Sequence, residues 1–239
     1  IDNRGSRFEV SGLISRNRNL DNFVFDYSWI TDRKTTSRAG ISVGRTTYHQ
    51  VPRRQSDEIF DLSIDAGGHS TDLRLYGITP VWKTIHDGFV WNYAYKFRNY
   101  TQSVNYTQTI DLSAYGLGKY QRDGHSQDEN YIHTFSLGFS GYKRSLFNDL
   151  FNYSFTLYNG YVSPRTEDAE QQAILGYTNG NYFRAVANVD YRKLFNKYIE
   201  FHTNFTWQSA SKNLVGAEQL TVGGANGVRG YGDGEGSGD

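Results

Sequence analysis

Large aromatic residues occupy every second position over long stretches of this chain, and this feature limits the possible folds more than any other. From Phe89 to Phe97 every odd position is Phe, Trp or Tyr, while Lys96 and Arg98 lie at even positions. Near the C-terminal end, residues 199–208 alternate in the same way. Successive side chains of a β-strand point to opposite faces, so each stretch predicts a strand with one apolar and one wet face.

The same alternation recurs along the chain and predicts about eleven antiparallel strands. The connectors between them alternate in character: Gly67–Ser70 is short, whereas 163–181 and 212–239 are long and polar. No segment predicts a convincing helix. We therefore expect one sheet, with barrel strands over 1–211 and a Gly-rich segment over 212–239.

The composition of the 239 residues excludes several classes of protein. The 25 Lys and Arg balance 25 Asp and Glu, which argues against the basic surface of a nucleic-acid-binding protein. With no Cys there is no disulfide framework and no thiolate metal site. No run of apolar residues is long enough for a transmembrane helix, and the first residues show no signal peptide. The six His have no metal-binding spacing, and no nucleophile with a base is evident, so we expect no catalytic residue, metal or cofactor.

The two faces of the predicted strands favour a membrane barrel over a soluble β protein. Soluble cores prefer branched aliphatic residues, whereas these apolar faces are dominated by rings. Transmembrane barrels carry an apolar outer face with aromatic girdles and a polar interior. A soluble carbohydrate-binding β-sandwich is the alternative. In the barrel, the candidates for lumen-facing side chains are Lys96, Arg98, Arg184, Asp190 and Glu200.

The strand count also suggests that the barrel is incomplete. Bacterial single-chain barrels have an even number of strands, with short turns on the periplasmic side and longer loops outside. Eleven strands that start from the periplasm end outside the cell. The segment after Lys212 is then an extracellular loop, and the strands that complete the barrel are absent from this chain.

The final segment contains an unusual density of glycine. Half of the residues from Gly223 to Gly238 are Gly, which suits a tight hairpin inside a confined lumen. Arg229 is the basic residue among these small residues, so its five-donor fork has open access to a carboxylate. A flexible linker or a single-copy Ca²⁺-binding turn are the alternative interpretations.

This segment resembles the Val-Arg-Gly-Tyr loop of the two-partner secretion translocators, the TpsB family, within the superfamily of outer-membrane insertases and translocators. The residues that carry the resemblance are Gly223, Gly224, Val228, Arg229, Gly230, Tyr231, Asp233 and Glu235, followed by Ser237-Gly238-Asp239. The opening residues 1–5 are similar to the start of the first barrel strand of that family, just after its periplasmic POTRA domains.

The resemblance implies a barrel of about sixteen strands in the bacterial outer membrane, whose sixth extracellular loop folds back into the lumen. It implies that Arg229 pairs there with an Asp of an F-x-D motif on a later strand, which this chain lacks, as it lacks POTRA domains. The implied function is export of a large unfolded partner protein, a TpsA-like exoprotein, with the lipid bilayer as the other partner and no small-molecule substrate. The alternatives are an insertase of the same superfamily, a diffusion porin, or an outer-membrane hydrolase with a Ser/His pair near the rim.

Overall fold

The computed structural model describes residues 5–14, 20–49, 53–57, 59–145, 149–196, 198–222 and 236–238. Ten strands form one antiparallel sheet, and two short strands form a separate hairpin. The sheet strands are β1 (Arg7–Ile14), β2 (Leu20–Asp32), β3 (Ser37–His49), β4 (Arg53–Ser56), β5 (Phe60–Lys83), β6 (Asp87–Asp111), β7 (Lys119–Arg144), β8 (Asp149–Pro164), β9 (Gly180–Asn196) and β10 (Ile199–Ala210). The hairpin consists of β11 (Leu220–Val222) and β12 (Gly236–Gly238).

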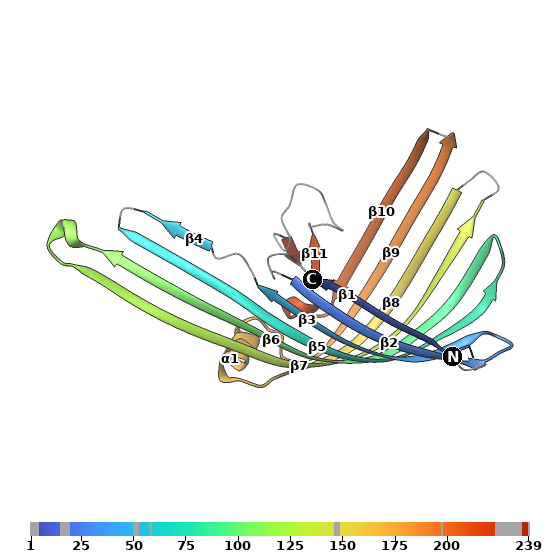
Figure 1. The fold of residues 1–239 in the computed structure, drawn as a ribbon, viewed down its shortest axis with the longest axis horizontal. Coiled ribbons are helices and arrows are strands. Elements are labelled where there is room, and N and C mark those ends of the chain that lie inside the picture. The colour runs from blue at the N-terminus through green and yellow to red at the C-terminus, as the bar shows by residue number, and fades with distance from the viewer. Residues whose placement is uncertain are drawn as a thin grey trace.

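The sheet is a meander in which chain neighbours pair, in the order β1-β2-β3-β5-β6-β7-β8-β9-β10, with β4 beside β5. Figure 1 shows it as a curved, open wall, with β11 inside the curve. Over the described residues β1 and β10 are edge strands, because they do not pair with each other. The predicted fold class, an all-β antiparallel sheet of an incomplete barrel, is confirmed.

Nine strands lie on the main path of the sheet, fewer than the predicted eleven, because two pairs of predicted strands are continuous. Gly67–Ser70, expected as a connector, lies in the middle of β5 and pairs with β3 and β6. β6 likewise runs unbroken through residues 99–106. In β5 the apolar residues lie at even positions before Gly67 and at odd positions after it. One unbroken strand therefore shows the sequence pattern that is expected of two strands.

The even-numbered Arg98 and Arg184 contact Glu218, which lies just before β11, so the aromatic and aliphatic side chains at odd positions lie on the opposite, outer face of the sheet. Many of these apolar side chains are exposed, among them Leu75, Trp91, Phe135, Leu157, Phe183 and Trp207. The other face carries the polar residues, and we call it the inner face. The predicted outward direction holds for the rings at odd positions, whereas Tyr48, Tyr76, Tyr100, Tyr106, Tyr142, Tyr158 and Tyr182, at even positions, lie on the inner face.

The apolar part of the outer face is limited to a band. On β6 it extends from Phe89 to Phe97, and from Asn99 onward the outer residues are polar. The outer face of β7 becomes polar at the same level of the sheet. Tyr131 pairs with Asn99, and the next outer residue toward the start of β7 is Glu129. Nine residues on β6 match the 9–11 that a strand needs to cross a bilayer. β5, β6 and β7 have 24, 25 and 26 residues, so they project far beyond the apolar band. Figure 1 shows these three strands extending past the other strands of the sheet.

Glycine faces tyrosine at seven cross-strand positions of the described sheet. At each pair a side chain on the glycine would overlap the tyrosine ring, so the ring lies flat over the neighbouring backbone, an arrangement that shields strand glycines. The pairs are Gly40–Tyr76, Gly68–Tyr48, Gly77–Tyr93, Gly88–Tyr142, Gly124–Tyr106, Gly141–Tyr153 and Gly160–Tyr182.

The connections differ at the two ends of the strands. The connections from β2 to β3, from β5 to β6 and from β7 to β8 are short. At the opposite rim the chain makes longer excursions, including the 3₁₀ turn η1 (Ser113–Tyr115) and the segment 165–179 between β8 and β9. This asymmetry is the one that the sequence pattern predicts for a barrel.

One α-helix, α1 (Glu167–Leu175), lies in the long connection 165–179, where no helix was predicted. The Thr166 hydroxyl caps it by accepting from Ala169 N, and it also donates to Gln127 O of β7 over 2.8 Å. Asp168 accepts from Gln127 N, so the start of the helix covers β7 backbone that β8 leaves unpaired. The described helices are all too short and polar to cross a membrane.

Candidate functional site

The chain after β10 turns back onto the inner face of the sheet. We call residues 211–219 the return segment; it includes the 3₁₀ turn η2 (Gly216–Glu218) and leads into β11. Leu214, 3% exposed, forms a buried cluster with Ile132, Val162 and Tyr182 from β7, β8 and β9. These three wall residues and the return segment thus make a small apolar core on an otherwise polar face.

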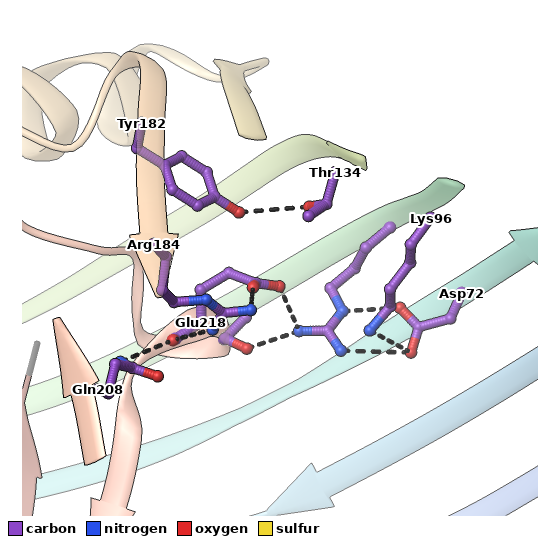
Figure 2. A network of polar contacts seen from close by, with 9 residues as sticks. Asp72, Lys96, Thr134, Tyr182, Arg184, Gln208 and Glu218 are labelled. Atoms are coloured by element: carbon purple, nitrogen blue, oxygen red, sulfur yellow. Dashed lines mark hydrogen bonds and ion pairs between the residues drawn. The ribbon is translucent and has the colours of Figure 1, made fainter. Parts of the chain in front are cut away.

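The position of Tyr182 depends on the glycine opposite. Gly160 on β8 is its cross-strand partner, and the absence of a side chain there lets the ring lie over β8. The Tyr182 hydroxyl reaches Thr134 Oγ1 on β7 over 3.3 Å (Figure 2). The surface against which Leu214 packs therefore requires a small residue at position 160.

Next to this core, five charged side chains from four parts of the chain meet (Figure 2). Arg98 of β6 and Arg184 of β9 flank Glu218 of the return segment, and we call these two arginines with Lys96 the cationic cradle. Lys96 and Arg98 share Asp72 of β5. Three cations thus face two carboxylates.

Glu218 is nearly enclosed, with a side chain 5% exposed. Its Oε2 lies 2.7 Å from Arg184 Nη2, and its Oε1 accepts from Arg98 Nη1 over 3.2 Å. The backbone is held as well: Arg98 Nη1 donates to Ala217 O over 2.6 Å, and Arg184 Nη1 donates to Glu218 O over 2.5 Å. Gln208 Nε2 also donates to Glu218 O, over 3.4 Å. Hydrogen bonds between charged groups are about twice as strong as neutral ones, so this contact is a firm anchor for the return segment.

Both arginines are held by other groups of the wall. Asp72 accepts from Arg98 through both carboxylate oxygens, over 2.7 and 3.4 Å. The Arg184 guanidinium lies 4.3 Å from the centre of the Tyr158 ring, a cation–π contact. Their side chains are only 16% and 12% exposed. The cradle therefore belongs to the wall, and Glu218 is the group that the return segment brings to it.

Three of the five predicted lumen-facing residues, Lys96, Arg98 and Arg184, come together in the cradle. Asp190 lies elsewhere on the same face, where it accepts from Asn152 and lies 2.6 Å from His202 Nε2. Glu200 is exposed at the start of β10, on the same side of the strand as His202.

The predicted loop residues Gly223, Gly224, Val228, Arg229, Gly230, Tyr231, Asp233 and Glu235 lie outside the described residues. The pairing of β11 with β12 brings the two ends of that segment together.

Sequence reasoning missed Glu218 and Asp72. Glu218 lies 120 residues from Arg98 in the chain, and no local pattern links two positions so far apart. Asp72 lies at an even position of β5, on the wet face, and that parity was the signal available. No three His, Asp or Glu of the described residues are placed to hold a metal ion. The charged side chains of this site bind groups of opposite charge, and its arginines also bind peptide carbonyls.

The comparison with protein families points to secretion. Residues 125–239 match the family model described as haemolysin secretion/activation protein ShlB/FhaC/HecB. Neither a curated protein nor a solved structure matches the chain. The matched residues run from β7 through β10 and the return segment to the end of the Gly-rich segment. The predicted resemblance to two-partner secretion translocators is confirmed, because residues 125–239 match the ShlB/FhaC/HecB family, whose members are outer-membrane proteins.

Proposed function

We propose that the protein to which this chain belongs exports a large, unfolded partner protein through the lumen of an outer-membrane barrel. The observation that carries the proposal is the docking of the return segment on the inner face. A wall that is apolar outside and polar inside suits a bilayer and a wet channel. A loop held inside that channel by charged contacts is a device to regulate passage, and a diffusion porin has no need of it. The family description, secretion and activation of haemolysin, points the same way.

The direction of transport follows from the two rims. Outer-membrane barrels have short turns on the periplasmic side and long loops outside. The short connections from β2 to β3, from β5 to β6 and from β7 to β8 are thus assigned to the periplasm. The cradle and α1 then lie toward the external mouth, and the polypeptide reaches the cradle late in its passage. Transport by this route needs no covalent chemistry at the wall, so we assign no enzymatic activity.

The apolar outer face also argues against the soluble carbohydrate-binding sandwich. A sandwich buries its apolar faces between two sheets. Here Trp91, Phe135 and Phe183 are exposed, and no second sheet of the described residues covers them. An insertase shares the architecture, and the word secretion in the family description favours export over insertion.

A secretion assay tests the proposal through Arg229, which is expected to hold the loop. The full-length protein is expressed in the outer membrane with its secreted partner, and the partner is quantified in the medium. Arg229→Ala should insert normally and secrete less than about a tenth of the wild-type amount, since breaking a buried ion pair costs about 3–5 kcal/mol. Arg33→Ala, in an exposed short turn, is the matched control and should secrete normally. Normal secretion by an inserted Arg229→Ala variant would contradict the role of the loop.

A further inference from the structure

The cradle recognises features that any acidic polypeptide carries. Arg98 and Arg184 bind the main-chain carbonyls of Ala217 and Glu218 and one carboxylate between them. None of these contacts involves a glycine. An extended chain with a Glu or Asp side chain offers the same three groups.

Without Glu218 one carboxylate, Asp72, remains for the three cations of the cradle. Lys96 and Arg98 still share Asp72, whereas Arg184 loses the carboxylate that binds it. Arg184 depends on Glu218 more than Arg98 does. Among the described residues Glu218 is the acidic partner of Arg184, and Arg184 Nε has no hydrogen-bond partner. A guanidinium that has lost its carboxylate can form a charge-assisted hydrogen bond with another one. Withdrawal of the return segment therefore leaves a site that attracts a replacement carboxylate.

The cradle is also preorganised for a carboxylate that replaces Glu218. Asp72 holds Arg98 and the Tyr158 ring supports Arg184, and neither contact involves the return segment. Side chains already held in their binding geometry lose little entropy when a ligand arrives, which raises affinity. The two arginines come from β6 and β9, with β7 and β8 between them, so the site lies across the wall.

We propose that the cationic cradle is a binding site for acidic side chains of the polypeptide in transit, and that Glu218 is its resident occupant. An acidic segment of the passing chain displaces Glu218, and Glu218 returns when that segment moves on. The exchange replaces one carboxylate by another, so the charge of the site is conserved. This inference rests on the proposed function and names the class of substrate that the wall prefers.

Peptide binding to the full-length protein in nanodiscs tests the exchange. The probe is a fluorescein-labelled, unstructured Gly-Ser peptide of about twelve residues with two Glu, and its partner probe has Gln at both positions. A tethered carboxylate competes at a local concentration in the millimolar range, so its removal should tighten binding of the acidic peptide by at least about tenfold in Glu218→Gln. The Gln peptide should show no gain. Glu200→Gln, an exposed carboxylate on the same face, is the matched control and should leave both affinities unchanged.

Two further substitutions make the result decisive. Because Leu214 also holds the return segment, Leu214→Ala with Glu218→Gln frees the site even if Glu218→Gln alone does not. Adding Arg184→Gln should abolish the gain in either background. The inference is overturned if neither freed variant gains affinity for the acidic peptide, or if the Gln peptide gains equally.

Secretion measured in cells separates this inference from the proposed function. If the wild-type protein does not secrete a partner, the proposed function fails, whatever the peptides do. If secretion is normal and peptide binding shows no dependence on charge, the inference alone fails.

Discussion

Substitution of Leu214 measures how firmly the return segment is docked. Leu214→Ala removes the branched end of a side chain that is 3% exposed and packs on Ile132, Val162 and Tyr182. The residue lies outside the sheet, so its loss should weaken docking and leave the ladder of strands intact. We expect the return segment to open more often while the wall stays folded.

The size of the effect follows from the burial. Replacement of a buried Leu by Ala costs about 2–5 kcal/mol. The cluster has four fully buried members and adjoins the polar inner face, so the lower part of that range, about 2–3 kcal/mol, applies here. At 1.4 kcal/mol per factor of ten, the opening equilibrium constant should rise roughly 30- to 150-fold.

Hydrogen exchange followed by mass spectrometry is the assay, because it reports local opening separately from global unfolding. Peptides that cover 211–219 should exchange faster by that factor, and peptides from β7 and β8 should not change. Leu157→Ala is the matched control, since the same atoms are removed from an exposed outer-face residue. Unchanged exchange of 211–219 in Leu214→Ala would refute the docking argument, and so would equal acceleration in the control.

Three further expectations follow from single contacts. Gly160→Ala should destabilise the packing of Tyr182 by about 1–3 kcal/mol and accelerate exchange of the return segment, whereas Gly44→Ala, where a side chain meets only ordinary contacts, should not. Thr166→Ala should weaken α1 by about 1 kcal/mol, seen as faster exchange of its amides, and Thr166→Ser should restore them. The pKa of Asp111, at the outer end of β6 beyond the apolar band, is lowered to about 2 by hydrogen bonds from Ser113 and by Lys119. A carboxyl with a lowered pKa stabilises the folded tip above its ordinary pKa, and this contribution is lost as the pH falls toward 2. An NMR titration midpoint for Asp111 near 3.8 would contradict it.

The outer face of the wall was predictable because lipid imposes a simple rule on it. From Phe89 to Phe97 the bilayer requires an apolar side chain at each outer position, and nothing interrupts the alternation. The prediction failed where the environment changes along one strand. In β5, Leu73 and Leu75 face outward, whereas Leu62 and Ile64 have the opposite parity beyond the band, where water surrounds the outer face. The apolar positions thus change from even to odd at Gly67–Gly68, and in the sequence this change looks the same as a turn between two strands.

The helix and the cradle were not predictable for a different reason. α1 has nine residues and buries only Ala169 and Ala173, so its sequence carries little amphipathic pattern. Its stability comes from the Thr166 cap and from β7 backbone that no local sequence identifies. Glu218 can be recognised as the partner of the two arginines only once the strand order is known. The meander places β6 beside β7 and β8 beside β9, and this brings Arg98 and Arg184 to one site. The even positions of Lys96, Arg98 and Arg184 predicted the face, and the return segment determined their partner.

Among the contacts that hold the return segment, those of Leu214 and those of Glu218 share no partner. Leu214 packs on apolar groups of β7, β8 and β9, and Glu218 binds arginines of β6 and β9. The second contact depends on charge and can be exchanged for another carboxylate, whereas the apolar first contact does not depend on charge. An acidic segment of the passing chain competes with Glu218 for the arginines, but an acidic side chain cannot replace the apolar contact of Leu214. The base of the Gly-rich loop is therefore able to exchange its ionic contact without leaving the wall, which keeps Glu218 near the cradle and favours its return.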